Sequence, residues 1–242
     1  MSQKKFECLI LAGGFGTRLK PINPSKPKPL IEISQKPFLF YQLNFLKNCG
    51  IKSVLISTGF QGEQIDNWVK NLDIPDLKIS CIQENIPLGT GGAIKNAIDF
   101  LEDDFVVCNG DTISIFDLSQ MMNFHMKKNS ILTMLIKKIS NSTRYGSVKI
   151  NPDNQIIKFQ DKTSLKNVWI SAGYFIFHKN NIDWGLYPDI FSYEDLFQKL
   201  IETSYSFGFT FDDYFIDIGT PQSFEKFQND FSKNNKLKIL FK

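Results

Sequence analysis

The sequence predicts an α/β protein in which helices cover a mostly parallel central sheet and a smaller antiparallel flap follows. In the first half of the chain, short apolar runs alternate with longer amphipathic stretches, which is typical of a parallel sheet with helical crossovers. Beyond residue 131 the runs become short and closely spaced, which is typical of antiparallel strands. The 242 residues contain no internal repeat and no low-complexity linker, so we expect a single domain over 1–242.

The alternation is clearest in the first 130 residues. Apolar or amphipathic segments follow one another there as 6–12, 38–48, 53–58, 63–69, 77–82, 91–101 and 105–108. The shorter segments have the length of a strand and the longer ones that of a helix. Residues 6–130 are therefore expected to supply the parallel strands and their covering helices.

A different spacing follows residue 131. Short apolar runs cover 131–136, 147–150, 156–159 and 168–177, and polar turns such as 151–154 separate them. This spacing predicts a more antiparallel sheet or flap in the second half of the chain. Most of the 23 phenylalanines recur at alternating or helical spacing, as Phe224, Phe227 and Phe231 do, so we assign them to core packing.

The composition narrows the classes of function. The net charge of +3 is small for this length and no long run of one sign occurs, so a nucleic-acid partner is not expected. The apolar run from Cys8 stops at Gly13, too short for a signal peptide or a membrane span. The four cysteines lie in apolar stretches without CxxC spacing and are expected to be reduced and buried: Cys8, Cys49, Cys81 and Cys108. We therefore expect a cytoplasmic protein, with no membrane partner, that acts on a small molecule.

A glycine-rich turn follows the first apolar strand. Residues 9–19 read Leu-Ile-Leu-Ala-Gly-Gly-Phe-Gly-Thr-Arg-Leu. Glycines let backbone N–H groups close around phosphate oxygens, so a phosphate is the expected ligand. A dinucleotide fold, a P-loop and a nucleotidyltransferase loop all remain possible from the glycines alone.

The residues after the glycines separate these three alternatives. A dinucleotide fold needs a third glycine where Leu19 stands and then a crossover helix, which the prolines at 21, 24, 27 and 29 forbid. A P-loop needs Gly-Lys followed by Ser or Thr, and no such triplet follows. Instead, a proline-stiffened arm holds Lys28 at a fixed distance from the loop. Lys28 and Arg18 together place two cations near one polyphosphate, which suits a triphosphate.

Two apolar runs end in an aspartate. Residues 105–108 lead into Asn109-Gly110-Asp111, and residues 214–216 lead into Asp217. Ligands of α/β proteins bind at the carboxyl ends of parallel strands, and a carboxylate in an apolar run is costly to bury without a cation. At a separation of about 4 Å the two carboxylates would repel by roughly 4 kcal/mol at an effective dielectric near 20, so a divalent ion is expected between them. Oxygen ligands without His or Cys favour Mg²⁺.

Six short motifs together resemble the sugar-1-phosphate nucleotidyltransferases over roughly residues 6 to 230. They are Gly13-Gly14-Phe15-Gly16-Thr17-Arg18-Leu19 with Pro27-Lys28-Pro29, Leu88-Gly89-Thr90-Gly91-Gly92-Ala93, Asn109-Gly110-Asp111, Arg144-Tyr145-Gly146, Asp161-Lys162, and Phe215-Ile216-Asp217-Ile218-Gly219-Thr220. The resemblance implies a Rossmann-like fold of the GT-A type and an enzyme that joins a nucleoside triphosphate to a sugar 1-phosphate and releases pyrophosphate. Residues 6–130 would then bind the nucleotide, and residues 131–230 the sugar phosphate.

The resemblance also implies roles for individual residues. Arg18 and Lys28 would neutralise the triphosphate, and Asp111 and Asp217 would hold Mg²⁺, so these four are the expected catalytic residues. The other expected nucleotide contacts are Leu11, Ala12, Gly13, Gly14, Gly16, Thr17, Gln83, Glu84, Leu88, Gly89, Thr90, Asn109 and Gly110. The expected sugar-phosphate contacts are Tyr145, Gly146, Asp161, Lys162, Ser171, Ala172 and Gly173. Among these, Lys162 would grip the attacking phosphate.

Substrate identity rests on finer features. Residues 58–65 and the compact length resemble the branch of this family that guanylylates D-glycero-α-D-manno-heptose 1-phosphate, which implies GTP as the nucleotide. Guanine offers N–H donors that call for an acceptor, and Glu84 is either that acceptor or a solvated side chain. Asp161 and Ser171 stand where the family often has Glu and Asn, and both departures lie on the sugar side. Mannose or glucose 1-phosphate, and UTP, CTP or dTTP, therefore stay open as alternative substrates.

The expected chemistry needs no general base, because the attacking phosphate oxygen is already ionised at neutral pH. His125 and His178 are accordingly expected to play no catalytic part. A non-catalytic regulatory subunit would lack a metal or phosphate residue, and none is missing. A purely structural protein would need a large apolar surface, which only the aromatic excess and the tail at 237–241 suggest. We expect that tail to pack on the protein or on a second copy, as in a homodimer.

Overall fold

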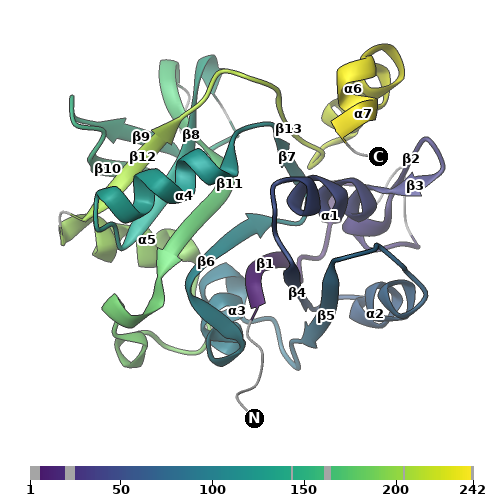
Figure 1. Ribbon diagram of the computed structural model, residues 1–242, viewed down its shortest axis with the longest axis horizontal. Helices are drawn as coiled ribbons and strands as arrows, with labels where there is room; N and C mark the ends of the chain where they lie inside the picture. Colours follow the sequence, from purple (N-terminus) through teal and green to yellow (C-terminus); the bar gives the residue numbers. More distant parts are fainter. Residues whose placement is uncertain (1–5, 20–24, 143, 161–164, 204, 241–242) are drawn as a thin grey trace.

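The computed structural model describes residues 6–19, 25–142, 144–160, 165–203 and 205–240, which form a nine-stranded sheet flanked by helices (Figure 1). Strand β1, Phe6–Ala12, pairs in parallel with β6, Leu101–Asn109, on one side and with β4, Ser53–Thr58, on the other. Strand β5, Lys78–Gln83, continues the parallel part beyond β4. The parallel strands predicted for the first half are therefore confirmed.

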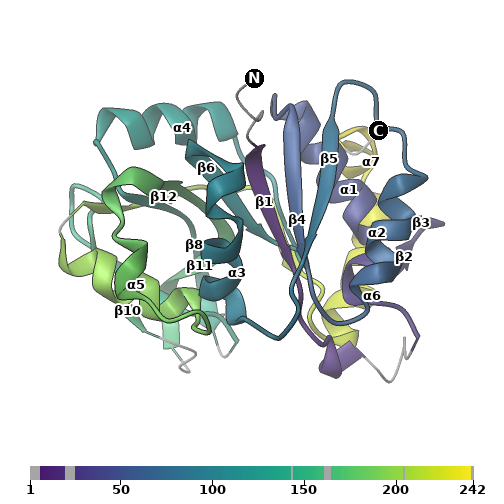
Figure 2. The same ribbon diagram turned by 90° about the horizontal axis from the view of Figure 1, so that it is seen from below.

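The second-half strands join the same sheet instead of forming a separate one. Strand β11, Leu165–His178, runs antiparallel to β6, and β8, Leu132–Ser142, runs antiparallel to β11. The sheet is completed by β9, Ser147–Ile150, by β10, Ile156–Gln160, and by β12, Ser206–Thr210, which is parallel to β8. Figure 2 shows β8, β11 and β12 on one side of β6, and β1, β4 and β5 on the other. The predicted antiparallel region is thus continuous with the parallel strands.

The central strands are buried on both faces, and their alternate residues enter two different hydrophobic cores. In β1, Cys8 and Ile10 belong to one core, whereas Leu9 belongs to the other. The first core is closed by α1, Phe38–Asn48, α2, Gly62–Lys70, α4, Leu118–Lys127, and α6, Pro221–Lys233. The second core is closed by α3, Gly89–Ala97, and α5, Tyr193–Glu202. Helices on both faces of a sheet are the layered α/β arrangement that the sequence predicted.

Two helices of the second half begin at side-chain caps. At α5, Ser192 and Asp195 form a capping box, in which each side chain accepts a hydrogen bond from the other residue's backbone N–H. At α6, Thr220 and Ser223 form the same motif, and Pro221 occupies the first turn, where its missing N–H does no harm. These caps fix where the helices start, and α6 therefore begins four residues after the predicted metal ligand Asp217.

Two small sheets lie outside the main one. Strand β7, Thr112–Ser114, pairs antiparallel with β13, Phe215–Asp217, and β2, Glu32–Ile33, pairs with β3, Lys36–Pro37. Between β1 and α1 the described residues contain no α-helix, only the 3-10 turns at 17–19 and 28–30 together with β2 and β3. This agrees with the exclusion of a dinucleotide fold from the proline pattern.

The structure divides one predicted segment and shows where the end of the chain packs. The segment 91–101 divides into α3, which begins at Gly89, a 3-10 turn at 98–100, and the start of β6 at Leu101. Strand β6 begins at Leu101, before the predicted start at residue 105, because Leu101 pairs with Phe6. The register between β1 and β6 then shifts, so that Cys8 pairs with Val106. At the end of the chain, α7, Asn235–Leu240, buries Leu237 in the first core, so the tail packs on the protein itself at this residue.

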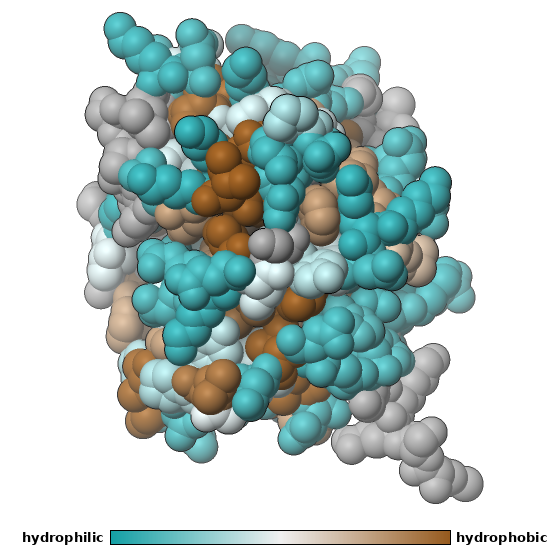
Figure 3. All heavy atoms as spheres, turned by 90° about the vertical axis from the view of Figure 1, so that its left-hand side faces the viewer, coloured by the Kyte–Doolittle hydropathy of each residue, from teal (hydrophilic) through white to brown (hydrophobic). Residues whose placement is uncertain are grey.

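The surface and the thiols fit the composition. No helix in the described part of the chain is long and apolar enough to cross a membrane. All four cysteines are free, and Cys8 and Cys108 are buried as predicted. Cys49 and Cys81, predicted to be buried, are only partly so, and this partial burial raises the pKa of each to about 11. These thiols therefore stay protonated at neutral pH. On the face in Figure 3, apolar residues reach the surface as narrow strips between hydrophilic ones.

Candidate active site

The first pocket opens where the glycine turn leaves β1, and its volume is about 430 Å³. Leu11 of β1 pairs with Asn109 of β6, so the glycine turn and the segment that leads to Asp111 leave the sheet side by side. The predicted nucleotide contacts that line this pocket are Leu11, Ala12, Gly13, Gly14, Gly16, Thr17, Arg18, Lys28, Glu84, Gly89, Thr90, Asn109 and Gly110. The pocket therefore gathers residues that lie in separate motifs of the sequence.

Close contacts explain two of the glycines in this pocket. A Cβ on Gly13 would lie 2.5 Å from Oε1 of Glu84, and a Cβ on Gly110 would lie 2.7 Å from the carbonyl oxygen of Leu11. By contrast, nothing lies within 4 Å of a Cβ position on Gly14. The backbone at Gly14 is therefore open to a ligand, as a phosphate site requires.

Glu84 links the glycine turn to the turn that precedes α3. Its Oε1 accepts a hydrogen bond from Ser57 Oγ at 3.0 Å, and its Oε2 accepts one from the Leu88 N–H at 3.2 Å. Glu84 is thus anchored at the pocket wall instead of being freely solvated. The structure places Gln83, the exposed last residue of β5, and Leu88 outside the pocket lining. Leu88 contributes through its backbone, by fixing the carboxylate of Glu84.

Lys28 and Asp111 form an ion pair in this pocket. Lys28 lies in a 3-10 turn between two prolines, and its Nζ donates a hydrogen bond to Oδ2 of Asp111. Thr112 Oγ1 donates to Oδ1 at 3.0 Å. Burial raises the pKa of Asp111, but Lys28, Thr112 and Arg18 together lower it by more, so the pKa lies below its usual range. Asp111 is therefore an anion at neutral pH.

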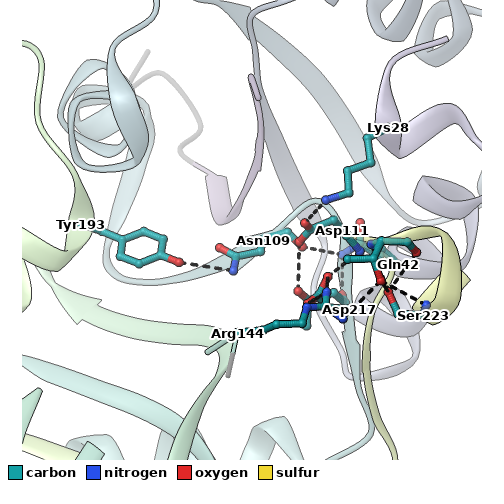
Figure 4. A network of polar contacts seen from close by, with 11 residues as sticks. Lys28, Gln42, Asn109, Asp111, Arg144, Tyr193, Asp217 and Ser223 are labelled. Atoms are coloured by element: carbon teal, nitrogen blue, oxygen red, sulfur yellow. Dashed lines mark hydrogen bonds and ion pairs between the residues drawn. The ribbon is translucent and has the colours of Figure 1, made fainter. Parts of the chain in front are cut away.

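The small sheet of β7 and β13 brings the second aspartate to the first. Asp217 pairs with Thr112, and the N–H of Ile218 donates to the carbonyl oxygen of Asp111 at 2.9 Å. Nη2 of Arg144 donates to both carboxylate oxygens of Asp217, at 3.1 and 2.8 Å (Figure 4). Both carboxylates line a second pocket, as expected from the strand ends on which they lie. Each of them already has a cationic partner.

The second pocket has a volume of about 170 Å³ and shares Arg18, Asn109, Asp111 and Tyr193 with the first. The predicted sugar-phosphate contacts that line it are Tyr145, Gly146, Ser171 and Gly173. Ala172 is fully buried behind the lining, where its carbonyl oxygen accepts a hydrogen bond from Ser114 Oγ at 2.9 Å. Asp161 and Lys162 lie outside the described residues. The described part of the predicted sugar side thus surrounds one small polar pocket.

Tyr193 is a pocket residue that no sequence motif revealed. It is the first residue of α5, its N–H donates to Thr90 Oγ1 at 2.8 Å, and its hydroxyl lies 3.5 Å from Nδ2 of Asn109 (Figure 4). The local signal, the capping box at residues 192–195, announces a helix start and not a ligand. The other residues of the second pocket that had no predicted role are Thr112, Arg144, Phe159, Glu194 and Phe215.

Tyr145 keeps its proton in this environment. Burial raises the pKa of its hydroxyl, and the negative charge of Asp217 raises that pKa further. The ring lies under the guanidinium of Arg144, with 5.6 Å between Cζ and the ring centre. Tyr145 therefore keeps its proton at neutral pH and does not act as a base in the second pocket.

The donor atoms of the two carboxylates suit Mg²⁺. In nucleotide enzymes Mg²⁺ takes one or two carboxylates and completes its shell with phosphates and water. Within the described residues, no group of three or more His, Cys, Asp or Glu side chains is arranged to hold a metal. A metal at Asp111 and Asp217 would therefore complete its ligand shell with water or with substrate phosphates.

Comparison with known proteins agrees with this geometry. Residues 7–234 match the nucleotidyl transferase family. The chain is 34% identical to D-glycero-alpha-D-manno-heptose 1-phosphate guanylyltransferase of Campylobacter jejuni over 91% of its length and 98% of that protein. It is 36% identical to the protein of the same name from Aneurinibacillus thermoaerophilus, over 93% and 97% of the two lengths. The crystal structure of HddC from Yersinia pseudotuberculosis complexed with GMP-PN superposes with a TM-score of 0.82 at 35% identity, over 93% of this chain and 99% of that one.

Proposed function

The chain belongs to the nucleotidyl transferase family, and from that premise we propose that it joins GTP to D-glycero-α-D-manno-heptose 1-phosphate, giving the GDP-sugar and pyrophosphate. The observation that carries this proposal is the shared wall of the two pockets. Arg18 and Asp111 line both, so a nucleotide on the glycine turn and a second phosphate in the smaller pocket would meet at these residues. The names of the two curated relatives support the choice of sugar and base.

The residues of the shared wall suit a phosphoryl-group transfer. The triphosphate would lie along the glycine turn, where Arg18 and Lys28 offset its charge. Asp111 and Asp217 would hold Mg²⁺, which offsets charge on the phosphates and orients them when bound. An oxygen of the sugar phosphate attacks the α-phosphorus, and the bond from that phosphorus to the bridging oxygen of pyrophosphate breaks.

No residue has to take up a proton in this reaction, because the attacking oxygen is already ionised. The chain contributes by alignment and by preorganised charge. This fits the lining of the two pockets, in which the described side chains include Arg, Lys, Asp, Glu and Tyr but no histidine.

Glu84 supports guanine as the base. Each oxygen of its carboxylate accepts one hydrogen bond, from Ser57 and from the N–H of Leu88, and an ionised carboxylate has acceptor sites left over. Guanine presents N–H donors at N1 and N2, which uracil, cytosine and thymine do not present in the same arrangement. An anchored Glu84 at the pocket wall would therefore favour GTP, since its position is fixed before the base arrives.

A pyrophosphate-release assay tests the proposal. The purified chain is given Mg²⁺, each of GTP, ATP, UTP, CTP and dTTP, and each of the heptose, mannose and glucose 1-phosphates. We expect the highest kcat/KM with GTP and the heptose 1-phosphate. A higher value with another pair would replace the base or the sugar while keeping the reaction. Nucleotide binding without pyrophosphate release in any combination would identify a regulatory subunit and overturn the proposed activity.

The cellular compartment and the oligomeric state are part of the same proposal. We place the enzyme in the cytoplasm, because four free thiols persist in a reducing compartment. A homodimer would have to use surface beyond Leu237, which is already buried within its own chain. Size-exclusion chromatography with light scattering decides between one copy and two.

A further inference from the structure

The chain uses arginine at two positions only. Of its 28 Lys and Arg residues, Arg18 and Arg144 are the arginines, and both line the second pocket. A guanidinium is a planar fork of five donors, whereas a lysine ammonium is a compact point charge. In a chain that otherwise uses lysine, two arginines at one pocket indicate that the fork itself is needed there, for carboxylate or phosphate oxygens.

The two arginines differ in the partners of their guanidinium groups. Arg18 is exposed, and its charge helps to lower the pKa of Asp111. Arg144 spans both oxygens of Asp217 with Nη2 and reaches Thr220 Oγ1 with Nη1 at 3.3 Å. Its Nε is buried and has no hydrogen-bond partner in the described part of the chain. Buried donors are nearly always satisfied in proteins, so the empty Nε indicates an acceptor that arrives later.

The surroundings of Gly219 show that two basic side chains lie close to the carboxylate of Asp217. A Cβ at this glycine would overlap Oδ1 of Asp217, and it would lie 3.3 Å from Nζ of Lys28 and 3.4 Å from Nη2 of Arg144. Two cations therefore surround the carboxylate that is proposed to bind Mg²⁺. A dication cannot take both oxygens of Asp217 while Arg144 spans them, because like charges at this distance repel.

We propose that Arg144 holds Asp217 in the absence of metal and passes to the phosphate of the sugar substrate when the carboxylate binds metal. The exchange rests on the proposed function. Before metal binds, the guanidinium offsets the charge of Asp217. After it binds, the fork, including Nε, faces a phosphate group whose oxygens accept several charge-assisted hydrogen bonds. Arg144 therefore competes with the metal and binds the second substrate.

Mn²⁺ binding to the full chain without any nucleotide tests the competition. Free Mn²⁺ is followed by electron paramagnetic resonance for the wild type, for Arg144→Gln and for Lys226→Gln. The last variant removes an ion pair with Asp230 on α6, outside both pockets, and serves as the matched control. We expect Arg144→Gln to bind Mn²⁺ about fivefold tighter, the scale of one partly exposed ion pair. The control should match the wild type, and an unchanged or weaker affinity in Arg144→Gln overturns the competition.

Steady-state kinetics test the transfer to phosphate. Arg144→Gln should raise the KM for the sugar 1-phosphate about tenfold, while the KM for GTP stays within about twofold, because one charge-assisted contact is lost on one substrate only. An equal change in both KM values overturns the transfer. Arg144→Lys keeps the charge but lacks the planar guanidinium, so it should recover less than half of the lost affinity for the sugar 1-phosphate. If Arg144→Gln does not fold, the KM values of Arg144→Lys decide whether Arg144 binds the phosphate. If the wild type turns over no sugar phosphate, the proposed function fails, while the Mn²⁺ measurement still decides the competition.

Discussion

One aspartate lies near the start of β6 and another just beyond its end, and the two have different basic partners. Asp104, near its start, lies beside the only two histidines of the sequence, with His178 Nδ1 2.8 Å and His125 Nε2 3.4 Å from its Oδ1. Asp111, just beyond its end, faces Lys28 and Arg18. Each aspartate lines a pocket, so the difference lies in the partners and not in the access of solvent.

The partners decide what each carboxylate can do. Burial raises the pKa of Asp111, but Lys28 and Arg18 help to hold it below its usual range. At the other end, burial lowers the pKa of His125 to about 4, so this histidine is neutral at pH 7 and shares a hydrogen bond of 2.8 Å with Thr133 Oγ1. Asp111 therefore lies in a charged binding site, whereas Asp104 lies beside a buried histidine that is neutral at pH 7.

The largest expected effect comes from the charged end. Asp111→Asn and Asp217→Asn should each lower kcat/KM by at least about a hundredfold, because each loses a charged ligand for Mg²⁺ without losing volume. The melting temperature should stay near that of the wild type. Asp104→Asn is the matched control on the same strand and should keep activity within about threefold. Near-normal turnover in either variant would remove that residue from the metal site.

Arg18 should have the next largest effect. Arg18→Ala should lower kcat between about tenfold and a hundredfold and raise the KM for GTP less, because charge on the α-phosphate grows toward the transition state. Lys26→Ala removes a neighbouring exposed cation that pairs with Glu32 outside the pocket lining, and should leave both constants nearly unchanged. A change confined to KM would assign Arg18 to ground-state binding alone.

The contrast between the two ends also shows what the sequence could predict. Residues 105–111 combine a buried apolar run with a turn and a carboxylate, and strand ends of parallel sheets gather ligands, so Asp111 could be placed from local pattern. The bounds of α1, β1 and β4 were predicted to the residue, since their periodicity is local.

Pairings between distant segments could not be predicted in the same way. Arg144 and Asp217 are 73 residues apart, and their ion pair depends on how β13 returns to β7. Tyr193 enters the pocket because α5 starts beside Thr90, a contact across 103 residues that no spacing records. Whether Gln83 lines the first pocket depends on where β5 ends, and the structure places this residue outside the lining. The roles of Asp161 and Lys162 stay predictions.

The buried histidine beside the start of β6 should affect the pH dependence of stability. His125 has an unfolded pKa of about 6.5 and a folded pKa of about 4, so the unfolded chain binds the extra proton between these values. Its contribution is fully present above about pH 6.5 and is lost as the pH falls toward 4. Between pH 7 and pH 5 the free energy of unfolding should fall by about 2 kcal/mol from this residue alone.

Urea unfolding at a series of pH values measures this loss. In His125→Gln the fall between pH 7 and pH 5 should be smaller by about 2 kcal/mol, because no group of low folded pKa remains at that position. An unchanged pH profile would show that the neutral state of His125 does not contribute to stability.

The smallest effect is expected for His178, on the same carboxylate. Its side chain is 31% exposed, against 2% for His125, although its nitrogen lies closer to Asp104. Solvent screens a partly exposed ion pair, and such pairs contribute about 0–1 kcal/mol. In urea unfolding, His178→Gln should therefore change the free energy of unfolding at pH 7 by less than about 1 kcal/mol. A larger change in His178→Gln would show that the contact with Asp104, and not the burial of the side chain, decides how much each histidine contributes to stability.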